Sequence, residues 1–233
     1  ILWIATAWLA AGLFIGPTVS GEEPKGQALG VNILFWALIL VVAGSMTGQW
    51  LSIFNKLNNG NLWFYFGHQG YEYVDLGRVW QIGLFIGLLL WLFLVTRSIV
   101  PAFRKPGEHK HLLALFLVST TAIGLFYGAG LSWGHQTHLS IVEYWRWWVI
   151  HLWVEGFFEV FATVVIAFFF TKLNLIKPLF AAEAALLSAT VYLSGGIIGT
   201  LHHLYFSGTP TVALAWGSVF SALEVVPLLL VAY

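Results

Sequence analysis

EYWRWWVIHLWVEGFFEV, residues 143–160, places a histidine and two glutamates at four-residue intervals inside an apolar and aromatic run. On an α-helix with 3.6 residues per turn, His151, Glu155 and Glu159 follow one another down a single face. Ionisable groups are costly inside a bilayer, so three in a line need partners such as a metal ion, protons or one another. The rest of the sequence indicates what could meet this face.

The composition is typical of a membrane protein. Of the 233 residues, 59% are hydrophobic and only 9% are charged, and the formal net charge is zero. This charge gives no indication of nucleic-acid binding. The absence of cysteine from the sequence excludes disulfides, thiolate metal sites and cysteine-ligated iron–sulfur clusters. Any metal would have to be held by His, Glu or Asp.

Seven apolar segments come near or above the length of about 20 residues that a helix needs to cross a bilayer. They cover roughly residues 1–16, 30–54, 79–100, 111–133, 143–171, 179–206 and 211–233. The sequence therefore predicts an all-α integral membrane protein, a bundle of about seven transmembrane helices in one domain over residues 1–233. Because the first and last segments are cut within apolar runs, we expect a fragment truncated at both ends.

Lys and Arg in the loops predict the orientation of the helices. The loops after the first, third and fifth segments contain seven of these residues and the other loops contain three, which places the first set in the cytoplasm. The residues are Lys25, Arg97, Arg104, Lys105, Lys110, Lys172 and Lys177 against Lys56, Arg78 and Arg146. Three tryptophans then fit an aromatic belt at the outer interface: Trp145, Trp147 and Trp148.

This topology brings three histidines to similar depth. At 1.5 Å per residue, His151 lies roughly 12 Å from the outer start of its helix at Glu143. His202 and His203, on the next segment, lie within roughly 8 Å of the same outer end. Three glutamates are deeper, at roughly 18, 24 and 20 Å: Glu155, Glu159 and Glu224. We therefore expect a histidine layer above a glutamate layer.

Three imidazoles and a carboxylate, here Glu155, suit iron, copper or zinc, and a carboxylate without thiolate favours non-haem Fe(II). A single histidine on an apolar face is more often a hydrogen-bonded core residue, but three at matched depth favour metal ligands. His202 and His203 point roughly 100° apart on an ideal helix, so both can bind one ion only if it sits between their faces or the helix is distorted. Nearby glycines could supply that distortion, admit a flat cofactor or serve ordinary packing: Gly195, Gly196 and Gly199.

Other polar groups have weaker indications of function. Glu159 and Glu224 could relay protons to the metal or, when protonated, hydrogen-bond neighbouring helices. The outer loop GHQGYEYVDLGR contains a cluster that could bind a cation or the carboxylates of a cofactor, or could simply be a structured loop: Glu72, Tyr73, Asp75 and Arg78. His135 and His138 lie in another outer loop and are weak metal candidates.

The motifs HLWVEGFFE, GTLHHLYFSGTP and GSVFSALEVVPL resemble those of the catalytic subunit of bacterial nitric oxide reductases, in the haem–copper oxidase superfamily. The resemblance implies part of a larger haem–copper oxidase-like fold, in which His151, His202 and His203 bind non-haem iron with Glu155 beside or on it. Many oxidases of the superfamily place a Tyr where this chain has Glu155. Glu159 and Glu224 match glutamates implicated in proton supply, and Glu72 matches one that in some members binds calcium near the haem propionates.

The resemblance also implies partners that the chain does not hold by itself. Two b-type haems would have axial histidines upstream of Ile1 and beyond Tyr233. The opening segment and the outer loop are more similar to quinol-dependent members than to cytochrome c-dependent ones. The expected function is the reduction of two NO to N2O and water in the inner membrane of a bacterium, with a homodimer among the oligomeric states left open. The rivals are an oxygen reductase with copper, and a metal-ion or proton transporter that uses the His and Glu side chains.

Overall fold

The computed structural model describes residues 2–71, 75–104 and 110–232, and within these ranges it describes all side chains except those of 2–9, 154–158, 193, 228 and 230–232. The described residues form helices and no strand, apart from one isolated bridge between His68 and Leu76. The prediction of an all-α fold is therefore confirmed.

All seven predicted apolar segments are helical. The first three correspond to α1 (Leu2–Ser20), α2 (Gln27–Ile53) and α4 (Arg78–Phe103), with the short α3 (Leu62–Phe66) in the loop before α4. The fourth is α5 (Lys110–Phe126) with the 3-10 helix η1 (Tyr127–Leu131), and the fifth is the continuous run of α6 (Leu139–Trp147), η2 (Trp148–Phe157) and α7 (Phe158–Lys172). The last two comprise α8 (Pro178–Gly199), η3 (Thr200–His203), η4 (Tyr205–Ser207), α9 (Thr211–Leu223) and α10 (Val225–Ala232).

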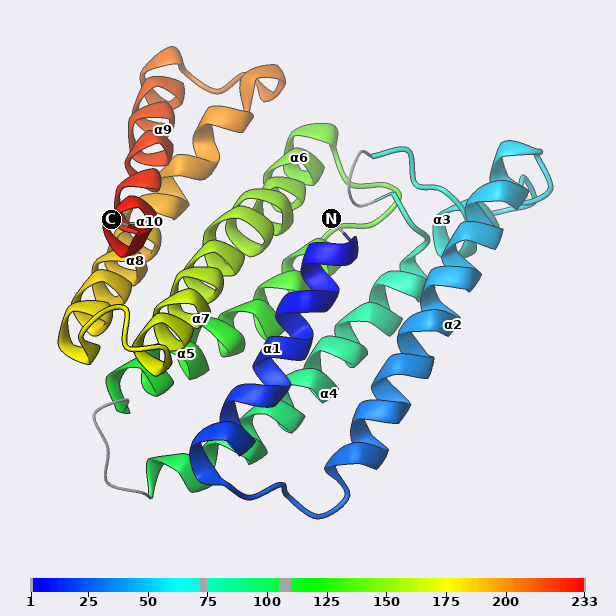
Figure 1. Ribbon diagram of the computed structural model, residues 1–233. Coiled ribbons are helices and arrows are strands. Elements are labelled where there is room, and N and C mark those ends of the chain that lie inside the picture. The colour runs from blue at the N-terminus through cyan, green and yellow to red at the C-terminus, as the bar shows by residue number, and fades with distance from the viewer. Residues whose placement is uncertain (1, 72–74, 105–109, 233) are drawn as a thin grey trace.

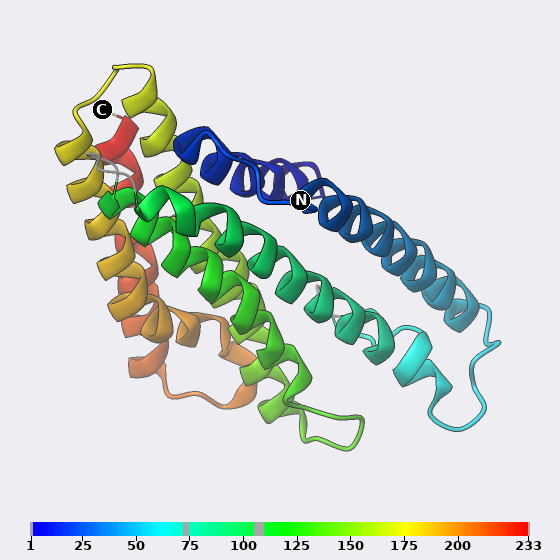
Figure 2. The ribbon, with the colours of Figure 1, turned by 90° about the horizontal axis from the view of Figure 1, so that it is seen from below.

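Consecutive helices run up and down one bundle (Figure 1). The connections 21–26 and 173–177 lie at one end of the bundle. The loop that carries η4 lies at the opposite end, and so does α3. This alternation is the one that the Lys and Arg count requires. Figure 2 shows α2 at one edge of the bundle and α8 to α10 at the opposite edge. The helices between them are joined by contacts of α4 with α5, α5 with α7 and α7 with α8.

Aromatic side chains fill the core between α4, α5 and α7. Trp91, Phe116 and Phe161 are almost fully buried, and the ring centroid of Phe161 lies 5.0 Å from that of Phe116 and 5.9 Å from that of Trp91. Close helix contact needs small residues. A Cβ atom at Gly16 of α1 would lie only 2.5 Å from Oγ of Ser98 on α4, so this crossing excludes a larger residue. The core fixes α7, and therefore the helix that carries His151, against the rest of the bundle.

Four helices are long and apolar enough to cross a membrane among the residues described: Gln27–Ile53, Arg78–Phe103, Lys110–Leu131 and Pro178–His203. Ala10–Ser20 and Thr211–Pro227 are shorter apolar helices. The most apolar window of α2 has no buried residue, as suits a helix at the edge of a membrane bundle. These helices indicate that the chain is part of a multi-pass membrane protein.

Candidate metal centre

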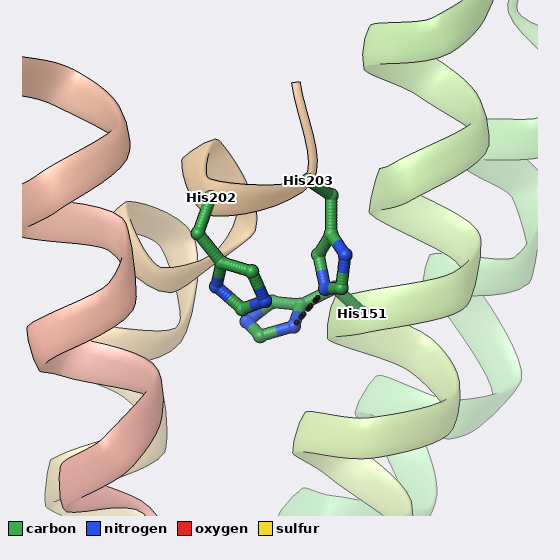
Figure 3. A group of neighbouring side chains, drawn as sticks. All are labelled: His151, His202 and His203. Carbon is green, nitrogen blue, oxygen red and sulfur yellow. Dashed lines mark hydrogen bonds between the residues drawn. The ribbon is translucent and has the colours of Figure 1, made fainter. Parts of the chain in front are cut away.

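His151, His202 and His203 converge in the structure as the depth estimate predicts (Figure 3). One ring nitrogen from each lies within 4.8 Å of the others. Nε2 of His203 is 3.2 Å from Nδ1 of His151, and the His202 and His203 ring centroids are 3.8 Å apart. Since His151 is completely buried and the other two are half-buried, the cluster is a compact group of nitrogen donors inside the bundle.

His151 lies in a π-helix, η2, inserted between the α-helices α6 and α7. A π-helix has i to i+5 hydrogen bonds, is rare, and is frequent at functional sites. Its turns contain more residues than the 3.6 of an α-helix, so the face of the element rotates as η2 passes into α7. The expected single face is accordingly not kept: His151 is buried, whereas Glu159 in α7 is exposed.

His202 and His203 come together because α8 changes its winding just before them. The α-helix ends at Gly199, and Thr200–His203 forms the 3-10 helix η3. The hydroxyl of Thr200 donates to the carbonyl of Gly196 at 3.0 Å, which supports the transition. The distortion that would let both histidines bind one ion is therefore present.

Glu224 belongs to the same group, which corrects the expected separation into two layers. Its Oε1 lies 3.8 Å from Nε2 of His151, and its side chain is buried. The estimate assumed ideal α-helices with a rise of about 1.5 Å per residue. His151 instead lies in the π-helix η2, and the sixth segment ends in the 3-10 helices η3 and η4. The hydroxyl of Tyr192 donates to the Glu224 carbonyl at 3.3 Å and holds the break between α9 and α10.

Two glycines have no side chain where His151 and His202 lie, and they thereby make room for these histidines. A Cβ at Gly199 would lie 2.8 Å from Nε2 of His151 and 3.4 Å from Oε1 of Glu224. A Cβ at Gly217 of α9 would lie 2.5 Å from the backbone nitrogen of His202. Three imidazoles and a carboxylate without thiolate, in a cradle that a single methyl group would fill, fit a first-row transition metal such as iron, copper or zinc.

Gly199→Ala tests this cradle directly. The methyl group would push the His151 ring away, and we expect the affinity of the full-length protein for Fe(II) to fall by about 10- to 100-fold, as it does when groups that orient ligands are changed. Equilibrium dialysis against a chelator series measures this affinity. Gly196→Ala is the matched control, since its Cβ would meet Leu152 and Glu224 at ordinary distances of 3.4 and 3.5 Å. Equal affinities of the two variants would contradict the steric argument.

Two predicted site residues fall partly or wholly outside the described part of the chain. The backbone of Glu155 belongs to η2, but its side chain is among those that the structure does not describe. Glu72 and its neighbour Tyr73 lie outside the described residues entirely. Their roles remain predictions from the sequence.

The described part of the outer loop is a structured cluster. Oδ2 of Asp75 pairs with Nδ1 of His68 at 3.2 Å. The buried Arg78 guanidinium donates to the carbonyls of Gly130 and Trp133, and it lies 4.8 Å from the Trp133 ring centroid. Arg78 thus ties the start of α4 to the η1 loop.

The two outer-loop histidines, His135 and His138, have separate partners. Nε2 of His135 lies 3.2 Å from Nδ2 of Asn61, and His138 is the N-cap of α6, where it accepts from the backbone N–H of Ser140. These contacts give each of them a structural role in its own loop.

Trp147 lies beside the histidine cluster, and the sequence did not identify it as a neighbour of this site. We expected an interfacial belt residue, but its ring is stacked on His203 with centroids 3.9 Å apart and planes 4° apart. Trp148 likewise stacks on Phe126 within the bundle. The spacing of four residues between Trp147 and His151 could have indicated this contact, because it puts the indole about one helical turn before His151.

The chain is similar to a protein family and to a curated protein. The model of a family described as cytochrome c and quinol oxidase polypeptide I matches residues 1–233. One of the subunits of the nitric oxide reductase from Stutzerimonas stutzeri is 26% identical over 231 residues, which are 97% of this chain and 46% of that protein. The chain therefore spans about half the length of this curated relative.

Proposed function

The chain belongs to the family of cytochrome c and quinol oxidase polypeptide I, and on this premise we propose that it is part of a membrane oxidoreductase that reduces nitric oxide. The reaction joins two NO with two protons and two electrons to give N2O and water. The observation that carries the proposal is the cluster of three histidines, one ring nitrogen of each lying within 4.8 Å of the others. One of them, His151, lies on the helical element that also carries Glu155. Similarity to one subunit of a nitric oxide reductase supports this choice within the family.

His151, His202 and His203 would hold a non-haem iron, with Glu155 beside or on it. When bound, the iron would supply Lewis acidity and an electron. A carboxylate among imidazoles favours iron, whereas many oxidases of the superfamily have Tyr at the position of Glu155. The oxygen atom that leaves NO must take up two protons to become water, and buried carboxyl groups can carry protons. The buried Glu224, 3.8 Å from Nε2 of His151, would give up a proton at the centre. Glu159, which is exposed on α7, would take a proton up from outside the cluster and supply it.

The partners follow from the same proposal. Electrons would come from quinol, with cytochrome c as the alternative donor, and the implied cofactors include two b-type haems and a calcium ion near Glu72. The protein would lie in the inner membrane of a bacterium, and a homodimer is one of its proposed states. Phe- and Leu-rich helices suit the entry of an uncharged gas from lipid.

An oxygen reductase with copper at the histidines is the second candidate, because the family description names oxidases. Purified full-length protein decides between the two. We expect one N2O for every two NO consumed, and non-haem iron in stoichiometric amount with respect to haem. Copper stoichiometric with haem, little non-haem iron and rapid O2 consumption would overturn the proposal in favour of the oxygen reductase.

A further inference from the structure

Each histidine of the centre has a different kind of support. His151 is fully buried beside Glu224 and Gly199, and the His202 backbone is packed against Gly217. His203 is half-buried and ends the short 3-10 helix η3, after which Leu204 leaves helical geometry. A ligand at the end of an irregular helix needs a fixed surface to hold its ring, because the backbone alone leaves the side chain free to rotate.

The Trp147 indole provides that surface. Its ring lies parallel to the His203 imidazole, with a 4° angle between planes and 3.9 Å between centroids. Most aromatic pairs in proteins have centroids about 4.5–7 Å apart, so this contact is close. The flat contact opposes rotation of the imidazole about its Cβ–Cγ bond and keeps Nε2 directed at His151, 3.2 Å away.

Two charged residues of the same helix hold the indole in turn. Trp147 Nε1–H donates to Oε2 of Glu143 at 3.2 Å, and Nη2 of Arg146 donates to the same oxygen at 2.9 Å. The Arg146 guanidinium carbon is 4.6 Å from the centroid of the Trp147 ring, a cation–π contact. Arg146 is 9% exposed, and burial makes such charge-assisted bonds stronger than at a free surface.

We propose that Trp147, held by Glu143 and Arg146, is the positioning residue of His203 and sets how tightly the centre binds its metal. The inference rests on the proposed iron site. It adds three residues that precede His151 in the chain and hold the ring of His203 in place: Glu143, Arg146 and Trp147. The α6 segment Glu143–Trp147 then serves the centre as a clamp, while η2 and η3 supply the ligands.

The test uses the full-length protein with its haems, and compares Trp147→Leu with Trp147→Phe. Leu removes the stacked ring, and we expect Fe(II) affinity in chelator dialysis to fall by about 10- to 100-fold, as for other outer partners of metal ligands. Phe keeps a ring on His203 but loses the bond to Glu143, so its loss should be smaller. The electron paramagnetic resonance spectrum of the bound iron should change in both variants, since the imidazole is reoriented.

Trp145→Leu is the matched control, because Trp145 lies on the same helix and its ring contacts Tyr144 and Trp148 instead. Glu143→Gln provides a second route if Trp147→Leu does not assemble. It keeps an acceptor for the indole but removes the charge paired with Arg146, and it should weaken iron binding less than the loss of the ring.

The outcomes separate the inference from the proposed function. Wild-type affinity and an unchanged spectrum in Trp147→Leu, or in Trp147→Phe and Glu143→Gln where Leu fails to assemble, would overturn the positioning role and leave the iron site standing. A loss in Trp145→Leu as large as in Trp147→Leu would overturn it as well. Wild-type protein without iron at the histidines would overturn both proposals.

Discussion

Replacement of His151 by Ala should abolish iron binding at the centre and lower the rate of NO reduction to about a thousandth or less, beyond the 10- to 100-fold losses typical of outer partners. His151 lies between the other groups of the cluster, with Nδ1 facing His203 and Nε2 facing Glu224. Its removal deletes one of three nitrogens and leaves the Glu224 carboxyl group buried without its imidazole. A buried group that loses its partner is strongly unfavourable, so the damage extends beyond the missing bond.

The measurement is non-haem iron per haem, together with N2O formation by gas chromatography. Haem content should remain, because the proposed role of His151 is to bind the non-haem iron. His111→Ala is the matched control: His111 is exposed at the start of α5 and should retain both iron and rate. Full iron content in His151→Ala would show that His151 does not bind the iron and would contradict the proposed role of the histidine cluster.

Glu155→Ala should give the second large effect, a loss of NO reduction of about a hundredfold or more with unchanged helix content. Glu155 lies in η2, four residues after His151. An Ala at this position removes a carboxylate from beside the imidazoles, and a ligand set with fewer carboxylates suits copper better relative to iron. We therefore expect the ratio of copper to iron bound by the purified protein to rise.

Metal analysis, NO consumption and circular dichroism together test this expectation. Glu183→Ala is the matched control, since Glu183 is exposed on α8 and should leave all three unchanged. Turnover at the wild-type rate in Glu155→Ala would show that this carboxylate takes no part in the reaction.

The sequence predicted the elements of the fold because hydropathy and helix length are local properties. It also predicted the convergence of His151 with His202 and His203, since a topology and a rise per residue are enough to place three side chains at one depth. The position of Glu224 was wrong for a related reason. The depth estimate assumed ideal α-helices, whereas η2 is a π-helix and η3 is a 3-10 helix. Their different rise per residue decides whether a carboxyl group lies beside the imidazoles or below them.

Winding and packing could not be predicted in the same way. A π-helix over Trp148–Phe157 depends on contacts with neighbouring helices, and it turns Glu159 away from the buried face of His151. The stack of Trp147 on His203 joins residues of two helices, whereas an aromatic residue near a helix end is by composition alone a belt residue. The space at Gly199 likewise exists only relative to His151.

The burial of His151 restricts how the protein can be assembled. His151 and its partner His203 are separated by the turn between α7 and α8, so no binding site exists until both helices have been inserted and paired. Once they have paired, no surface of His151 remains accessible. Among the described side chains of the cluster, His202 and His203 keep part of their surface exposed. If these histidines hold the proposed iron, the ion would therefore have to bind after the two helices have paired.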